Sequence, residues 1–377
     1  MKAVARAIWS FIKRTDKLLL ILCLLATALG ALMLYSLTQG GLLKSGMTVL
    51  KRQLEFAALG VTCAVILSAL DYRFLAKLWF LYVPPTLLMT LLTLTPLGVE
   101  RAGQRAWLKI ATGIQLQPSE FLKIAFILSF AFHLVKAGEH LNRFVNLLLL
   151  CLHGGLFIGA VMLQKDDGTA LVYVAIFVAM LFAAGISWKY IAAVGLASPG
   201  ILAILWFKVL EPYQKNRILS VINPELDTQG VSHQQLQSRI AIGSGQFQGK
   251  GLFGGSYVYV YEIENDFIFA HIGQTLGFLG CLITLLLLTG ICVKLIASAW
   301  RSEDLLGRLI CSGAFAMIFF HTAINVGMVV GILPVIGIPL PFISQGGTSV
   351  LSMYLAVGLC MSVHAHRPKP YTMFYRS

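Results

Sequence analysis

Long apolar runs, separated by short polar connections, follow one another along almost the whole chain. An α-helix needs about 20 apolar residues to cross the hydrocarbon core of a bilayer. Ten runs approach that length: Leu18–Leu37, Leu54–Leu70, Leu75–Leu97, Pro118–Val135, Val145–Leu163, Leu171–Gly185, Tyr190–Leu210, Phe267–Ile296, Leu309–Leu333 and Ser349–Val363. The sixth and the tenth runs are short and need their flanking residues to span the bilayer. The pattern predicts an all-α polytopic membrane protein of about ten transmembrane helices, with a single domain over residues 1–377.

One connection is much longer than the others and extends from about residue 211 to residue 266. Loops longer than about 15 residues without regular structure are usually functional or disordered. This loop is not of low complexity, because Ser238–Gly245 combines apolar and turn residues and predicts a short interfacial helix. A glycine-rich return is expected from Gly249, Gly251, Gly254 and Gly255. We expect this long loop to be extracytoplasmic.

The composition excludes several classes of protein. A soluble domain carries about 25% charged residues, whereas this chain has 12%, with 58% hydrophobic residues. A soluble enzyme, a disordered tail protein and a fibrous chain are therefore excluded. The net charge of +13 does not indicate a nucleic acid partner, because the basic residues lie in short connections where phospholipid head groups explain them. The seven cysteines lie in apolar runs, and neither they nor the histidines show metal-ligand spacing, so no disulfide framework or metal site is predicted.

Basic residues are distributed unevenly between the two sides of the predicted bundle. Ten crossings place both ends on one side, and the termini there carry Lys2, Arg6, Lys13, Arg14, Lys17, Arg367, Lys369 and Arg376. More than half of the 29 lysines and arginines belong to this side, which predicts that both termini are cytoplasmic. Short outer connections nevertheless hold Lys44, Lys51, Arg52, Arg101, Arg105, Lys109 and Lys165. An anionic ligand on the outer face would explain these exceptions.

Two of the outer connections hold polar residues that could bind such a ligand. Arg105 and Trp107 form either an interfacial anchor or a site for phosphate and head groups. Pro118 suits the first position of a helix, and Glu120 suits its positive end. Lys123 lies on the same helix face as Glu120, so the two can pair. Capping does not explain a lysine one turn deeper, and ionisable groups at membrane depth are functional candidates.

Carboxylates gather in two further places. Asp166 and Asp167 form either a plain polar turn or a site for a cation or a sugar hydroxyl. Glu262, Glu264 and Asp266 meet where the long loop enters the eighth run. One alternative makes Asn265 or Asp266 the helix N-cap. The other is a general base whose proton affinity is raised by neighbouring charges and partial desolvation.

The segment from Asn325 to Ser349 is rich in glycine and proline, and Pro334, Pro339 and Pro341 break the helix. Non-helical backbone at membrane depth is costly unless it is buried or lines a cavity. Gly346 and Gly347 open the last helix, where backbone amides can cradle an anion. The segment therefore predicts a cavity at the outer end of the bundle.

In this order, the motifs resemble those of the SEDS family, the shape, elongation, division and sporulation proteins that include RodA, FtsW and SpoVE. The similarity covers nearly the whole chain from residue 51 to the basic tail. The most specific pieces are GQRAW (Gly103–Trp107), QPSEFLK (Gln117–Lys123), QSRIAIGSG (Gln237–Gly245), NDFIFA (Asn265–Ala270) and GILPVIGIPLPFIS with GGTS (Gly331–Ser349). The long loop and short tail are more similar to RodA or SpoVE than to the division-specific members, and we expect RodA to be closest.

The resemblance implies a peptidoglycan glycosyltransferase that polymerises lipid II on the outer face of the bacterial cytoplasmic membrane, for cell-wall elongation and cell shape. It implies that Asp266 is the catalytic aspartate. The substrate site that we expect consists of Arg52, Arg105, Trp107, Glu120, Lys123, Asp166, Arg217, Gln237, Ser238, Glu262, Asn325, Ser344, Gly346, Gly347 and Ser349. The implied partners are lipid II, the undecaprenyl-linked nascent glycan and a class B penicillin-binding transpeptidase. No cofactor is expected, apart from a divalent cation that Asp166 could hold.

The expected chemistry needs few groups. The 4-hydroxyl of an acceptor sugar attacks the anomeric carbon of a donor linked to lipid diphosphate, and the configuration inverts. As in inverting glycoside hydrolysis, one carboxylate can serve as base. The hypothesis makes Asp266 that base, and positive charge then stabilises the departing diphosphate. The residues predicted to bind the diphosphate are Arg105, Lys123 and Arg217.

The chain departs from the usual family pattern in four places. The usual Pro-Asp-Leu-Gly turn is Lys165-Asp166-Asp167-Gly168, the usual Glu-Glu is Gln274-Thr275, the usual Ser-Tyr-Gly-Gly is Ser344-Gln345-Gly346-Gly347, and Gln246 replaces a glycine. These departures keep open a catalytically silent scaffold that recruits a transpeptidase, although the retained Asp266 and Lys123 argue against it. A lipid-linked precursor flippase is the other alternative. It is disfavoured because the ionisable residues cluster at the outer helix ends and no repeat is visible.

Overall fold

The computed structural model describes residues 15–43, 45–101, 103–111, 114–222, 231–253 and 256–367. Some residues used in the sequence analysis lie outside this part of the chain: Lys2, Arg6, Lys13, Arg14, Lys44, Gly254, Gly255, Lys369 and Arg376.

Eight helices in the described part are long and apolar enough to cross a membrane. They are α2 (Lys17–Gln39), α3 (Gly46–Ala69), α6 (Pro118–Ala137), α7 (Phe144–Met162), α9 (Trp188–Ile204), α12 (Ile268–Trp300), α13 (Leu305–Val329) and α14 (Gly347–Ala365). Two shorter apolar helices, α5 (Trp79–Leu92) and α8 (Asp167–Ala183), complete the set. These helices coincide with the ten predicted runs, so the prediction of about ten transmembrane helices is confirmed.

Short helical elements fill the connections. They are α4 (Tyr72–Lys77), η1 (Gly138–His140), η2 (Leu205–Val209), α10 (Pro212–Ile222) and α11 (Val231–Ser244). The interfacial helix predicted at Ser238–Gly245 is the second half of α11. The described start of the glycine-rich return pairs with α12, since Gly251 N donates to Thr275 O at 3.0 Å, just before a kink at Gly277, which has φ +65°. The long loop is thus partly helical.

A small antiparallel sheet lies between α5 and α6, and the apolar pattern does not predict it. Its strands are β1 (Gly98–Arg101), β2 (Gln104–Ala111) and β3 (Ile114–Leu116), in that order. Trp107 pairs with Val99, and Leu108 pairs with Leu116. β1 and β3 have only four and three residues, and β2 lacks a strict alternation of polar and apolar residues, because Trp107 and Leu108 are adjacent. The all-α prediction therefore holds for the membrane-spanning body.

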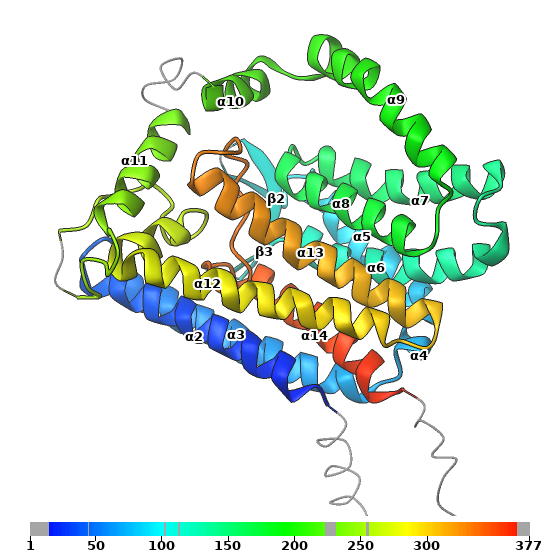
Figure 1. The fold of residues 1–377 in the computed structure, drawn as a ribbon, viewed down its shortest axis with the longest axis horizontal. Coiled ribbons are helices and arrows are strands. Elements are labelled where there is room, and N and C mark those ends of the chain that lie inside the picture. The colour runs from blue at the N-terminus through cyan, green and yellow to red at the C-terminus, as the bar shows by residue number, and fades with distance from the viewer. Residues whose placement is uncertain are drawn as a thin grey trace, which may run out of the picture.

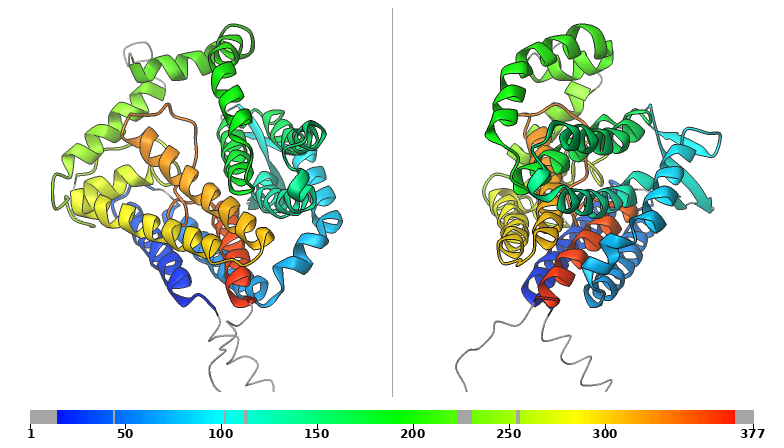
Figure 2. Two further views of the ribbon diagram at one scale, coloured as in Figure 1. Left: turned by 45° about the vertical axis from the view of Figure 1, so that its right-hand side comes forward. Right: turned by 90° about the vertical axis from the view of Figure 1, so that its right-hand side faces the viewer.

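Helices α6, α13 and α14 form the interior of the bundle, whereas α9 stands away from it. α3 packs closely on α14, because Gly358 lies against the backbone of Ala64 and Gly60 lies against Tyr354. No residue of α9 is buried. Figures 1 and 2 show α9, α10 and α11 as an arch that projects from the bundle. α2 begins and α14 ends at the same end of the bundle (Figure 2).

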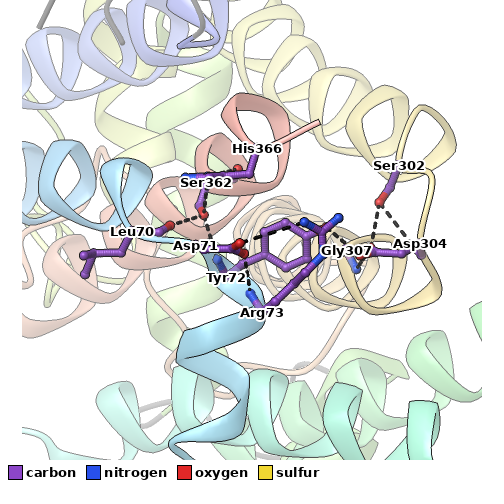
Figure 3. Close-up of polar contacts among 9 residues, drawn as sticks. All are labelled: Leu70, Asp71, Tyr72, Arg73, Ser302, Asp304, Gly307, Ser362 and His366. Carbon is purple, nitrogen blue, oxygen red and sulfur yellow. Dashed lines mark hydrogen bonds and ion pairs between the residues drawn. The ribbon is translucent and has the colours of Figure 1, made fainter. Parts of the chain in front are cut away.

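Polar contacts tie three segments together near the end of α14 (Figure 3). Asp304, which caps α13, accepts hydrogen bonds from Tyr72 OH at 2.7 Å and Arg73 Nε at 2.8 Å. Ser362 Oγ accepts from Tyr72 N at 3.1 Å and donates to Leu70 O. The α3–α4 junction is therefore held to both the α12–α13 connection and α14.

Candidate active site

A cavity of about 540 Å³ opens among the starts of α6, α8, α12 and α14. Its charged lining comprises Arg52, Arg101, Arg217, Glu55, Glu120, Asp166, Glu262 and Asp266. Glutamines, backbone glycines and the side chains of Trp107 and Tyr261 complete much of the wall. Since α14 begins here and ends where α2 begins, the cavity lies at the opposite end of the bundle from the start of α2.

Asp266 projects into this cavity just before α12. Burial raises its pKa to about 7, and the negative charges of Glu262, Asp166 and Glu264 add to the shift. The N-cap alternative is wrong, because the N-cap of α12 is Phe267 and no side chain caps this helix. Gly337 lies beside the carboxylate, and a Cβ there would be 3.4 Å from Asp266 Oδ2. The carboxyl group is therefore directed to the cavity and can exchange a proton near neutral pH.

The backbone around Asp266 is held by residues behind the cavity wall. Asn325 Nδ2 donates to Asp266 O at 2.8 Å and to Ile338 O at 2.7 Å. Ser344 Oγ donates to Asn265 O at 2.6 Å. Asn325 and Ser344 therefore join the start of α12 to the proline-rich loop 330–346, and neither lines the cavity.

Glu120 and Lys123 form the predicted pair, with Lys123 Nζ 2.9 Å from Glu120 Oε1. Lys123 is fully buried and does not line the cavity, whereas Glu120 does. His321 Nε2 lies 3.0 Å from the same Nζ, and Ser352 Oγ donates to Glu120 Oε2 at 2.6 Å. A buried charge needs a partner, and this network of side chains supplies it. No residue pattern indicated that His321 takes part.

Asp166 both caps α8 and lines the cavity. Its Oδ1 accepts from Thr169 N at 3.0 Å and so caps α8, while Oδ2 accepts from Gln117 Nε2 at 2.9 Å on the cavity side. Burial raises its pKa, although the Thr169 hydrogen bond opposes the shift. Within the described residues, no group of three or more His, Cys, Asp or Glu side chains is arranged to hold a metal ion.

The start of α14 borders the cavity as predicted, with Gly346, Gly347 and Ser349 in its wall. Gly346 N donates to Gln53 Oε1 at 3.2 Å, so α3 already occupies this backbone donor. Gln53 Nε2 in turn donates to Ser344 O at 2.9 Å. The predicted anion cradle is therefore restricted to the amides that follow Gly346.

Besides Lys123, Asn325 and Ser344, three further expected substrate-binding residues lie away from the cavity wall. Arg105 is exposed, and its Nη1 donates to Leu94 O at 3.4 Å. Gln237 has His233 as its side-chain neighbour, at 3.5 Å, and Ser238 Oγ donates to Val329 O at 2.7 Å. Ser238 thus anchors α11 to α13.

The sequence analysis missed several residues of the cavity wall, among them Gln53, Glu55, Gln104, Gln115, Gln117, Tyr261 and Gln345. Arg101 also lines the wall, with its guanidinium 5.8 Å from the centre of the Trp107 ring. Arg101 could have been found from the sequence, because it is one of the basic residues in the outer connections. Arg52, from the same set, also reaches the cavity. Both arginines fit the anionic ligand that those residues suggested.

The fold and the site together define a multi-pass membrane protein with a charged cavity among helix starts at one end. The chain belongs to the FtsW/RodA/SpoVE family, whose sequence profile, described as cell cycle protein, matches residues 16–369.

Two bacterial proteins are similar to this chain in sequence over most of its length. The peptidoglycan glycosyltransferase MrdB of Escherichia coli K12 is 31% identical over 324 residues, 85% of this chain and 86% of that protein. Stage V sporulation protein E of Bacillus subtilis is 34% identical over 360 residues, 92% of this chain and 96% of that protein. A solved structure of a peptidoglycan synthase complex, described as coordinating polymerisation and crosslinking, contains a chain with 28% identity and a TM-score of 0.79. That match covers 94% of this chain and 99% of that chain.

Rod shape determining protein RodA of Thermus thermophilus matches with a TM-score of 0.69 and 26% identity. This match covers 94% of the chain studied and 98% of RodA.

Proposed function

We propose that this chain is a peptidoglycan glycosyltransferase that polymerises lipid II for cell-wall elongation and cell shape. The observation that carries the proposal is the position of Asp266, a carboxylate with a pKa near 7 in a cavity that also contains three arginines. Membership of the family supplies the substrate class, because MrdB is named for this activity. A base and cationic groups in one cavity are what transfer from a lipid diphosphate requires.

In the proposed reaction, the acceptor 4-hydroxyl oxygen attacks the anomeric carbon of the donor. The bond from that carbon to the diphosphate oxygen breaks, the configuration inverts, and the hydroxyl proton passes to Asp266. The lipid diphosphate leaves as an anion, which needs positive charge rather than a general acid.

The cavity favours a revised set of diphosphate partners. Arg217 keeps its expected role, and Arg52 and Arg101 replace Arg105 and Lys123. Lys123 is already paired with Glu120 and buried, so its role is to neutralise that carboxylate. Arg105 lies outside the cavity wall, and we propose that it acts as an anchor at the membrane interface.

We assign the cavity to the outer face of the cytoplasmic membrane and both termini to the cytoplasm. The start of α2 and the end of α14 lie together opposite the cavity, and the basic residues of the sequence are more abundant on that side. A class B transpeptidase is the proposed partner, since a relative occurs in a complex described by both polymerisation and crosslinking.

The departures Gln274 and Thr275 do not favour the silent scaffold. Both are buried and absent from the cavity wall. Gln274 Oε1 accepts from Val258 N at 3.0 Å, and Thr275 Oγ1 donates to His271 O at 2.7 Å. Gln274 thus joins the long loop to α12, whereas Thr275 bonds within the helix, and neither side chain belongs to the cavity wall. The flippase alternative is disfavoured because the cavity and its charged lining lie at one end of the bundle rather than at its middle.

The test is polymerisation of lipid II by purified protein, alone and with a candidate transpeptidase. We expect glycan strands from the wild type, and a loss of about 10²- to 10⁴-fold for Asp266→Asn, the usual contribution of a general base. Glu139→Gln, on an exposed residue of η1, is the matched control and should retain activity. Normal polymerisation by Asp266→Asn would refute the base assignment. A wild type that binds lipid II without making product would favour the scaffold or flippase.

A further inference from the structure

Apolar packing does not fix the position of α10 above the bundle. α10 is the middle element of the arch in Figures 1 and 2. Among its side chains that the structure describes, only Ser220 is buried. The preceding helix α9 has no buried residue and offers no rigid support. Its polar contacts with the bundle therefore help to set where α10 lies.

One carboxylate makes those contacts. Gln214 Nε2 donates to Asp167 Oδ2 at 2.7 Å, and Tyr213 OH donates to the same oxygen at 3.2 Å. In the described part of the chain, both side-chain hydrogen bonds that join α10 to another element end on this atom. Asp167 is the first residue of α8, a helix packed in the bundle, so the acceptor is fixed. Hydrogen bonds to an ionised acceptor are stronger than those between neutral groups.

The next turn of α10 carries a cavity residue. Arg217 follows Tyr213 by four positions, and its guanidinium lies 5.5 Å from the centre of the Tyr213 ring. Residues four apart lie on the same face of a helix. Arg217 lines the cavity with Asp166, whose carboxylate caps α8 and faces the cavity. The two adjacent aspartates thus point to different partners.

We propose that Asp167 is a positioning residue, which anchors α10 to α8 and so places Arg217 where it binds the diphosphate of a lipid-linked sugar substrate. This inference rests on the proposed function for the identity of the substrate. The usual family turn has leucine at this place, and leucine has no hydrogen-bond acceptor in its side chain. The anchor is thus a feature of this chain.

The experiment compares Asp167→Leu with Asp167→Asn. The amide oxygen of Asp167→Asn still accepts from Gln214, whereas Asp167→Leu accepts nothing. We expect Asp167→Leu to raise the KM for lipid II roughly tenfold, the scale of one hydrogen bond to a charged group, and to lower kcat as well, because Arg217 also stabilises the departing diphosphate. Asp167→Asn should have a much smaller effect than Asp167→Leu, because its amide oxygen still accepts the hydrogen bonds and only their charge is lost. In an Arg217→Ala background, Asp167→Leu should add no further change in KM, because its effect passes through Arg217.

Hydrogen–deuterium exchange of residues 212–222 gives a second readout that does not depend on activity. Exchange there should increase in Asp167→Leu and not in Asp167→Asn. Unchanged exchange, or a changed exchange with an unchanged KM, would overturn the inference while leaving the transferase intact. Equal effects of the asparagine and leucine variants would also overturn it, since charge rather than anchoring would then act. A wild type without polymerase activity would refute the proposed function instead, and the exchange measurement would still test the anchor.

Discussion

At the scale of single residues, the environment of a charged side chain indicates whether it stabilises the fold or takes part in the reaction. Lys123 is enclosed by Glu120 and His321, so its charge is used within the protein. Asp266 lies near other carboxylates, and the structure places no cation in direct contact with its side chain among the described residues. The first arrangement pairs the charge inside the protein, whereas the second favours the protonated form of Asp266. Only the second leaves a carboxyl group that can exchange a proton near pH 7.

The pH dependence of polymerisation follows from the raised pKa of Asp266. A base must be deprotonated, so activity is retained above the pKa of about 7 and lost as the pH falls below it. We expect kcat/KM to fall about tenfold for each pH unit well below that value. A pH–rate profile on lipid II measures this limb. The assignment fails if the wild-type profile stays flat from pH 8 to pH 5.

Breaking the buried pair should destabilise the protein. Lys123→Met leaves Glu120 charged and buried, which costs about 3–5 kcal/mol of unfolding free energy. The double variant Lys123→Met/Glu120→Gln removes both charges and should recover much of that loss. Unfolding in a detergent titration measures the difference. Similar stability of the single variant and the wild type would show that the pair is not a structural requirement.

At the scale of elements, the proline-rich loop 330–346 and the start of α12 act as one unit. Asn325 bonds the backbone of both, and Ser344 adds a second link. The sequence predicted that the prolines end the helix and that a cavity follows, because exposed irregular backbone is costly in a membrane. It assigned Asn325 and Ser344 to substrate binding, whereas their side chains satisfy backbone carbonyl groups. Short polar side chains serve both purposes, and only their contacts distinguish the two.

Gly337 offers a test of this unit. It has φ +76°, and a Cβ there would touch the Asp266 carboxylate. We expect Gly337→Ala to lower kcat at least tenfold. Backbone strain should also lower the free energy of unfolding by about 1–2 kcal/mol. Gly185→Ala is the matched control, because Gly185 has φ +88° with open space around it. The assay is polymerisation at saturating lipid II, and equal activity of the two variants would exclude a special role for Gly337.

At the scale of the whole molecule, the two ends of the bundle differ in their charged groups. The end where α2 begins holds closed ion pairs, such as Asp16 with Lys294 at 2.8 Å and Asp304 with Arg73 at 2.8 Å. The opposite end holds the open cavity with its arginines. Charged side chains that pair with one another hold helices together. A cavity lined by side chains of both charges is suited to a charged substrate.

The membrane orientation can be measured with single cysteines. We expect Lys165→Cys, beside the cavity, to react with a membrane-impermeant thiol reagent added to intact spheroplasts. Arg301→Cys, at the end of α12, should react only after the membrane is permeabilised. The background needs its accessible native cysteine Cys151 replaced. The opposite labelling pattern would reverse the proposed orientation.

The sequence by itself determined the membrane-spanning architecture, because the need to bury about 20 apolar residues per crossing leaves a periodic signature. It also determined the Glu120–Lys123 pair and the helix starts at Pro118 and Gly347, since these depend on contacts within one or two turns. Only the tertiary structure decided which polar groups face the cavity, as Arg101 and Arg105 show. It also brought Asp167 to α10 and Asn325 to Asp266. Such contacts join residues far apart in the chain, and no local pattern of residue types records them.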